Sequence, residues 1–238
     1  MGVVAPRLDP TVRLWLAVGL AGFCLLPWYA VDGGFWSFGW LLDGWPLDTD
    51  VAPALFLVLQ GEKLWLAPMG LVLLLPLLTW GRGKADPAFG RILVVIGALG
   101  LFWLMLQGFT IGLRGWRYPW LTELFGKLDG RQFGMGYGAL ATALAFLFLM
   151  SLGIAARGAV GGDVFVVGAI AFVVATVALF VFMPIVQMLL NAFVTDEGGY
   201  ALGAFGRRLL ADKLWSLGCL AGGPRCGRLP RRGTHRRS

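Results

Sequence analysis

The chain has 238 residues, of which 58% are hydrophobic and 14% charged, and its mean hydropathy is +0.76. An ordinary soluble domain is about half apolar and about a quarter charged, so this composition excludes that class and predicts an all-α, polytopic membrane helix bundle. The formal charge of +7 does not indicate a nucleic-acid-binding surface, because the basic residues lie between apolar runs and in a terminal tail.

The first predicted membrane span is the uncharged run of residues 14–31, which follows Arg7, Asp9 and Arg13. A cleaved signal peptide is the alternative. The apolar core of a signal peptide has about 7–15 residues and ends near small side chains, whereas this run is longer and ends in a proline and two aromatic residues. The sequence therefore predicts a retained helix whose aromatic residues lie at the membrane interface.

Residues 32–63 form a loop rich in tryptophan, glycine and acidic residues. Tryptophans of this kind are typical of the headgroup region, and glycines allow the chain to turn along the surface. A cation-binding loop is the alternative, although the carboxylates lack the spacing of an EF-hand. The apolar stretch 51–59 is too short to cross a bilayer, so we expect it to be interfacial or re-entrant.

The next three predicted spans are uncharged runs, at residues 64–80, 92–113 and 133–156. Pro68 and Pro76 should bend the second span. Residues 114–132 carry charges of both signs and several aromatic side chains, so we expect an interfacial segment with a short surface helix. In the fourth span, Gly134 and Gly138 have the small-xxx-small spacing that permits close helix packing.

The longest apolar run, residues 164–190, has no charged residue and lies between Asp163 and Asp196. As a helix that rises about 1.5 Å per residue, it exceeds the roughly 30 Å hydrocarbon core of a bilayer, so we expect it to cross with a tilt. Asp163 is suited to cap its first turn. The chain is thus predicted to have about five transmembrane helices plus surface helices, with its two ends on opposite sides.

The orientation of the five spans depends on the distribution of Lys and Arg. Two arginines precede the first span, and no basic residue follows it until Lys63, which favours a cytoplasmic N-terminus. Counted over all loops before the tail, six basic residues would then be cytoplasmic and nine external, which favours the opposite orientation. Because the first helix usually dominates, we predict that the N-terminus is cytoplasmic.

The sequence contains no pattern that indicates catalysis or a metal site. Its single histidine, His235, lies in the tail, and three cysteines are too few for a four-ligand metal site. All 13 acidic residues lie outside the predicted spans, whereas ion and proton pathways typically contain ionisable groups within the membrane. We therefore predict a protein that is not an enzyme and not a proton-coupled transporter, with no metal and no cofactor.

Residues 202–217 repeat leucine and phenylalanine at helical spacing. They predict an amphipathic helix that lies on the membrane, with a packed helix of a small extramembrane domain as the alternative. Cys219 and Cys226 follow, on either side of a Gly-Gly-Pro turn that can bring them together. If this segment is outside the cytoplasm, the two thiols could form a disulfide; two separate thiols are the alternative.

A resemblance to a known family covers residues 179–227. It rests on a late proline in an apolar helix, an Asn-Ala-Phe sequence, an acidic turn with glycines and a cysteine-bracketed stretch, at residues 182–185 (FMPI), 191–193 (NAF), 196–199 (DEGG) and 217–227 (LGCLAGGPRCG). In these features the chain resembles the opening of the permease subunit of binding-protein-dependent ABC importers, in particular the ferric-iron type and its relatives for thiamine and phosphonates.

The resemblance implies a multi-pass protein of the bacterial inner membrane that takes part in the transport of iron(III). Residues 164–227 would be the start of the permease domain, a transmembrane helix followed by a periplasmic amphipathic segment, and residues 1–163 a four-helix membrane region. The implied partners, besides membrane lipid, are a cytoplasmic ATPase subunit, a periplasmic substrate-binding protein and a second permease half. A structural or assembly protein without transport activity is one alternative, and a membrane enzyme with polar groups at residues 114–131 is another.

The chain departs from this family after residue 227. Such permeases continue into several further helices and a cytoplasmic loop with an EAA-type motif that receives the ATPase, and nothing here matches that motif. Residues 228–238 are instead strongly basic, as a shifted reading frame in GC-rich DNA would produce, and we expect a truncated permease. A basic tail that binds anionic lipid is the alternative.

Overall fold

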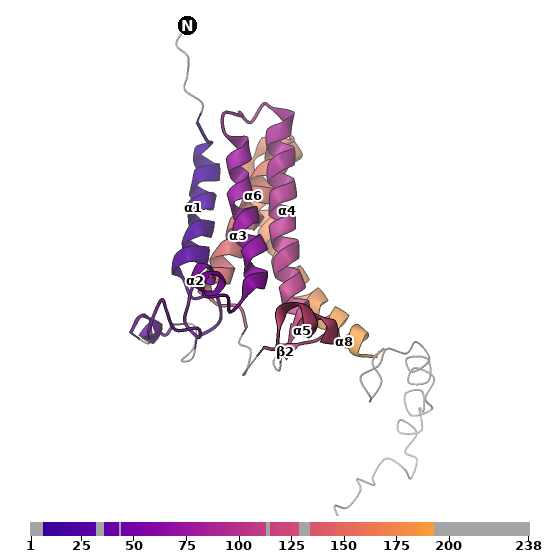
Figure 1. Ribbon diagram of the computed structural model, residues 1–238. Helices are drawn as coiled ribbons and strands as arrows, with labels where there is room; N and C mark the ends of the chain where they lie inside the picture. Colours follow the sequence, from indigo (N-terminus) through magenta and orange to yellow (C-terminus); the bar gives the residue numbers. More distant parts are fainter. Residues whose placement is uncertain (1–6, 32–35, 43, 113–114, 129–133, 193–238) are drawn as a thin grey trace, which may run out of the picture. The chain divides into compact units, whose positions relative to one another are not determined.

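The computed structural model describes residues 7–31, 36–42, 44–112, 115–128 and 134–192. The chain divides into two units, Met1–Val174 and Ala175–Ser238. Most of the described residues are helical. The first unit contains a bundle of four helices that lie alongside one another (Figure 1), namely α1 (Pro10–Leu25), α3 (Ala67–Leu74), α4 (Pro87–Thr110) and α6 (Tyr137–Ala156).

Shorter elements connect these helices at the two ends of the bundle. One end carries η1 (Gly39–Leu41), α2 (Ala54–Leu59), η2 (Leu64–Leu66), the antiparallel pair β1 (Ile111–Gly112) and β2 (Gly115–Trp116), and α5 (Pro119–Phe125). The other end carries the loop that follows η3 (Leu75–Thr79), and η4 (Ala159–Gly162). The last helical stretch consists of α7 (Val164–Val177), η5 (Ala178–Phe182) and α8 (Met183–Ala192).

Three described helical stretches are long and apolar enough to cross a membrane, judged by length and composition: Pro87–Thr110, Tyr137–Ala156 and Val164–Leu189. They correspond to the predicted third, fourth and fifth spans. The first and second predicted spans form shorter apolar helices, Pro10–Leu25 and Leu64–Thr79. At about 1.5 Å per residue Pro10–Leu25 is about 24 Å long. Half of Leu64–Thr79 is 3₁₀ helix, which rises about 2.0 Å per residue, so that stretch is about 28 Å long. Both are shorter than the roughly 30 Å hydrocarbon core.

Helix α1 begins and ends earlier than the predicted span of residues 14–31. Asp9 caps its first turn, since a carboxylate oxygen accepts the Thr11 N–H at 2.9 Å, and Pro10 occupies the first helical position. The helix ends at Leu25, because Leu26 precedes Pro27 and adopts an extended conformation. The apolar residues after Leu26 therefore belong to a connecting segment.

The two prolines of the second span, which were predicted to bend it, stand where its helix type changes. Pro68 stands in the first turn of α3, and Pro76 stands in the first turn of the 3₁₀ segment η3. A proline lacks the N–H that an α-helical ladder needs, and it is tolerated in the first turn. The short helix predicted within residues 114–132 is present as α5, and the apolar stretch 51–59 contains the six-residue helix α2.

Helix α6 lies against both α1 and α4 at positions where glycine permits close approach. A Cβ atom at Gly22 would lie 2.8 Å from the Gly138 carbonyl oxygen, and one at Gly97 would lie 2.6 Å from the Phe146 carbonyl oxygen. The Trp15 ring of α1 stacks on the Phe148 ring of α6, with centroids 4.2 Å apart and planes at 9°. Close packing therefore holds α6 between its two neighbours.

The predicted Gly134–Gly138 packing pair is right for one glycine and wrong for the other. Gly138 contacts α1, but a Cβ at Gly134 would meet nothing within 4 Å. The reason is that α6 begins only at Tyr137. The residues ahead of it pair with the segment after α1: the Ala30 N–H donates to the Gly134 carbonyl, and the Gly136 N–H to the Trp28 carbonyl, both at 2.8 Å.

The predicted helix of residues 164–190 is present and changes type near its middle. Five residues, Ala178–Phe182, form a π-helical turn, and α8 follows from Met183. This turn ends two residues before Pro184, which lacks an N–H and whose ring crowds the preceding turn. The predicted amphipathic helix of residues 202–217 lies outside the described residues.

The close contact of α4 with α6 can be tested at Gly97. Gly97→Leu should lower the free energy of unfolding in detergent micelles by about 1–3 kcal/mol, because the added side chain overfills a tight contact, although leucine has the higher helix propensity. Gly134→Leu is the matched control and should leave the unfolding free energy nearly unchanged. A variant Gly97→Leu as stable as the original chain would contradict the packing described here.

Candidate functional site

Three N-capping aspartates gather at one end of the first unit, which we call the charged end. Asp9 caps α1, Asp86 caps α4 and Asp163 caps α7. The Asp86 carboxylate accepts the Ala88 N–H at 2.8 Å, and the Asp163 carboxylate accepts the Phe165 N–H at 2.9 Å, which confirms the predicted cap. Each cap satisfies a backbone donor at a helix start.

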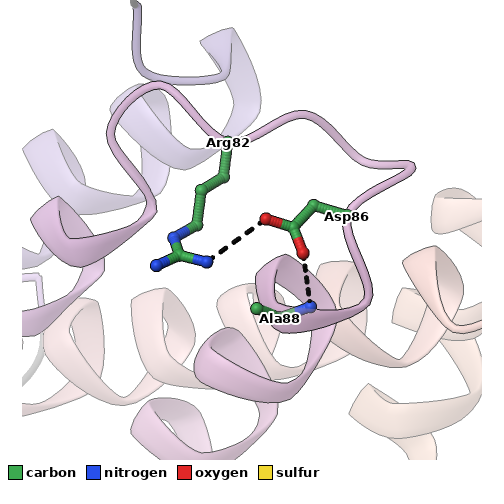
Figure 2. Close-up of polar contacts among 3 residues, drawn as sticks. All are labelled: Arg82, Asp86 and Ala88. Atoms are coloured by element: carbon green, nitrogen blue, oxygen red, sulfur yellow. Dashed lines mark hydrogen bonds and ion pairs between the residues drawn. The ribbon is translucent and has the colours of Figure 1, made fainter.

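Two basic side chains of the loop after η3 pair with these capping aspartates. Figure 2 shows Asp86 between two partners: one oxygen accepts the Ala88 N–H, and the other lies 3.2 Å from Arg82 Nη1. Lys84 Nζ lies 3.6 Å from an Asp9 oxygen. Both ion pairs are partly exposed, so each contributes only about 0–1 kcal/mol. The caps therefore matter more than the pairs.

Substitutions at Asp86 and Arg82 separate the contribution of the helix cap to stability from that of the ion pair. Asp86→Ala should lower the free energy of unfolding by about 1 kcal/mol, because the Ala88 N–H loses its acceptor. Asp86→Asn keeps an acceptor and should cost less, and Arg82→Gln should have little effect, since an exposed pair is weak. The measurement is chemical unfolding in detergent. If Arg82→Gln cost as much as Asp86→Ala, the ion pair rather than the cap would be stabilising.

The opposite end of the first unit, which we call the aromatic end, is held together by backbone pairing. The segment after α1 lies between the chain before α2 and the chain before α6, through bridges of Pro27 with Pro53 and of Tyr29 with Met135. The Trp28 N–H donates to the Ala52 carbonyl at 3.2 Å. These hydrogen bonds satisfy backbone groups of a buried connecting segment that lies outside any helix.

Lys63 is a half-buried charged residue at the aromatic end. Its ammonium lies 3.9 Å from the centroid of the Tyr29 ring, a cation–π contact. Burial lowers the pKa of Lys63, while the nearby Asp50 and Glu62 carboxylates raise it. The Trp65 ring packs edge-on against Trp116 beside this contact, with centroids 4.9 Å apart. Such a layer of rings with a cation suits the headgroup depth of a membrane.

The sequence did not reveal the contact between Lys63 and Tyr29. One signal was available in the sequence. Tyr29 lies near the end of the first apolar run and Lys63 lies directly before the second, and consecutive antiparallel helices place such positions at the same end of a bundle.

The predicted cysteine pair, Cys219 and Cys226, lies outside the described residues. Within the described ranges, no group of three or more His, Cys, Asp or Glu side chains could hold a metal ion, and Cys24 is a free thiol.

Comparison of the chain with protein-family models, with curated proteins and with solved structures gave no match.

Proposed function

We propose that this chain is a membrane-spanning permease component of a binding-protein-dependent ABC importer in a bacterial inner membrane, with ferric iron as its substrate. The observation that carries the proposal is the apolar helical stretch Val164–Leu189. Its late proline, Pro184, is followed by the residues that resemble the opening of such a permease domain.

The exposure of this stretch is consistent with a helix that lipid or further helices surround. Phe165 exposes 83% of its surface, Phe180 73% and Met188 72%. Large apolar side chains in such numbers are stable only in an apolar environment. In the proposed importer, lipid and a second permease half provide that environment, a cytoplasmic ATPase supplies the energy, and a periplasmic binding protein delivers the substrate.

Five membrane spans and a cytoplasmic N-terminus are part of the proposal. The helices Pro10–Leu25 and Leu64–Thr79 are short, but a bilayer adapts to a short span by thinning locally at modest cost. Both pack within the bundle that contains the long helices α4 and α6. The charged end, with Arg7 before the first helix and Arg13 near the start of it, would then face the cytoplasm, and the aromatic end the periplasm.

The proposal is tested by deleting the gene and measuring uptake of radiolabelled ferric iron by whole cells. Deletion should abolish the ATP-dependent part of this uptake, and a plasmid copy should restore it. Uptake of zinc serves as the control and should not change, because the proposed importer receives its substrate from a dedicated binding protein.

Thiamine and phosphonate uptake are measured in the same strains. If the deletion removes one of these activities instead, the importer assignment stands and the iron assignment is wrong. If the deletion changes none of the three, the transport function is contradicted, and the chain is better described as a structural or assembly membrane protein.

A further inference from the structure

An open groove of about 440 Å³ lies at the charged end of the first unit, between α1 and the end of η3. One wall is a single face of α1, since its residues stand at positions i, i+3, i+4 and i+7 of the helix, namely Arg13, Leu16, Ala17 and Leu20. Leu77 and Trp80 form the other wall. Along α1 the groove extends about 10 Å from Arg13 toward the middle of the bundle.

Positive charge is concentrated at the mouth of this groove. Arg7 and Arg13 both line it, and both side chains are exposed. Among the described residues neither arginine forms an ion pair, whereas Asp9, the nearest acid in the sequence, caps α1 and lies 3.6 Å from Lys84 Nζ. The carboxylate is therefore engaged elsewhere, and the two guanidinium groups remain available to an anion.

The inner part of the groove is apolar. Leu16 is buried and Leu20 half-buried on the α1 side, and Leu77 is partly exposed on the opposite side. Trp80 exposes 60% of its surface at the rim. An indole at the rim of an apolar channel is typical of the membrane interface, where one edge of the ring contacts hydrocarbon and its N–H contacts polar headgroups.

We propose that this groove binds one anionic phospholipid, with its phosphate between Arg7 and Arg13 and an acyl chain along Leu16 and Leu20. Guanidinium groups bind phosphate oxygens through paired, charge-assisted hydrogen bonds. A zwitterionic lipid would bring its own cation close to the two arginines, so it binds more weakly. Free phosphate would gain nothing from the apolar wall. The site is independent of the proposed transport function.

The test uses the purified full-length chain in detergent micelles and native mass spectrometry. The probes are phosphatidylglycerol and phosphatidylcholine with identical acyl chains. The original chain should prefer phosphatidylglycerol, and the double variant Arg7→Gln, Arg13→Gln should bind it about tenfold or more weakly, with little change for phosphatidylcholine. Arg91→Gln is the matched control, because it removes an exposed positive charge at the same end but outside the groove.

A second variant tests the apolar wall without a change of charge. Ala17→Trp fills the groove from an exposed position and should weaken binding of both lipids. The proposal is overturned if the double arginine variant binds phosphatidylglycerol as well as the original chain, or if Arg91→Gln loses as much. Unchanged binding in Ala17→Trp, or displacement of the lipid by equimolar inorganic phosphate, would overturn it as well.

Discussion

The bundle of the first unit depends on the close approach of α6 to the helices beside it. Apolar helices in lipid gain little from hydrophobic association, because lipid chains are as apolar as the side chains that they replace. Contacts at Gly22, Gly97 and Gly138 allow neighbouring backbones to pack closely and so gain dispersion energy. The buried Thr142 hydroxyl adds a hydrogen bond to the Gly19 carbonyl of α1 at 3.4 Å. Close backbone contacts and this hydrogen bond thus hold α6 against α1.

The two ends satisfy their polar groups in different ways. At the charged end, aspartates accept N–H groups in the first turns of α1, α4 and α7, and two of them pair with Lys84 and Arg82. At the aromatic end, connecting segments pair with one another through backbone hydrogen bonds, and the Trp65 and Trp116 rings pack edge to face. A hydrocarbon layer offers no hydrogen bonds, so both arrangements are what helices need where they leave it. The proposed lipid groove opens at the charged end, where cations and apolar walls meet.

The apolar runs of the sequence correctly predicted where the helices lie. The helix cap at Asp163 was also predicted from the sequence. The end of α1 and the start of α6 were not predicted correctly. Residues 26–31 and 134–136 carry no charge, like the helices beside them, but they form extended segments that pair with each other. Hydropathy does not distinguish these conformations, although Pro27 was a local signal. The contact of Lys63 with Tyr29 and the groove beside Arg13 arise from residues distant in the sequence, so only the packed structure reveals them.

The proposed permease component requires its charged and aromatic ends to lie on opposite sides of a membrane. The most direct test of this arrangement replaces the native cysteines with serine and introduces one cysteine, either Glu62→Cys at the aromatic end or Gly83→Cys at the charged end, both at exposed positions. Spheroplasts are then treated with a membrane-impermeant maleimide. With the N-terminus in the cytoplasm, Glu62→Cys should react in intact spheroplasts, and Gly83→Cys should react only after the membrane is opened. Equal labelling of both positions in intact spheroplasts would contradict this arrangement.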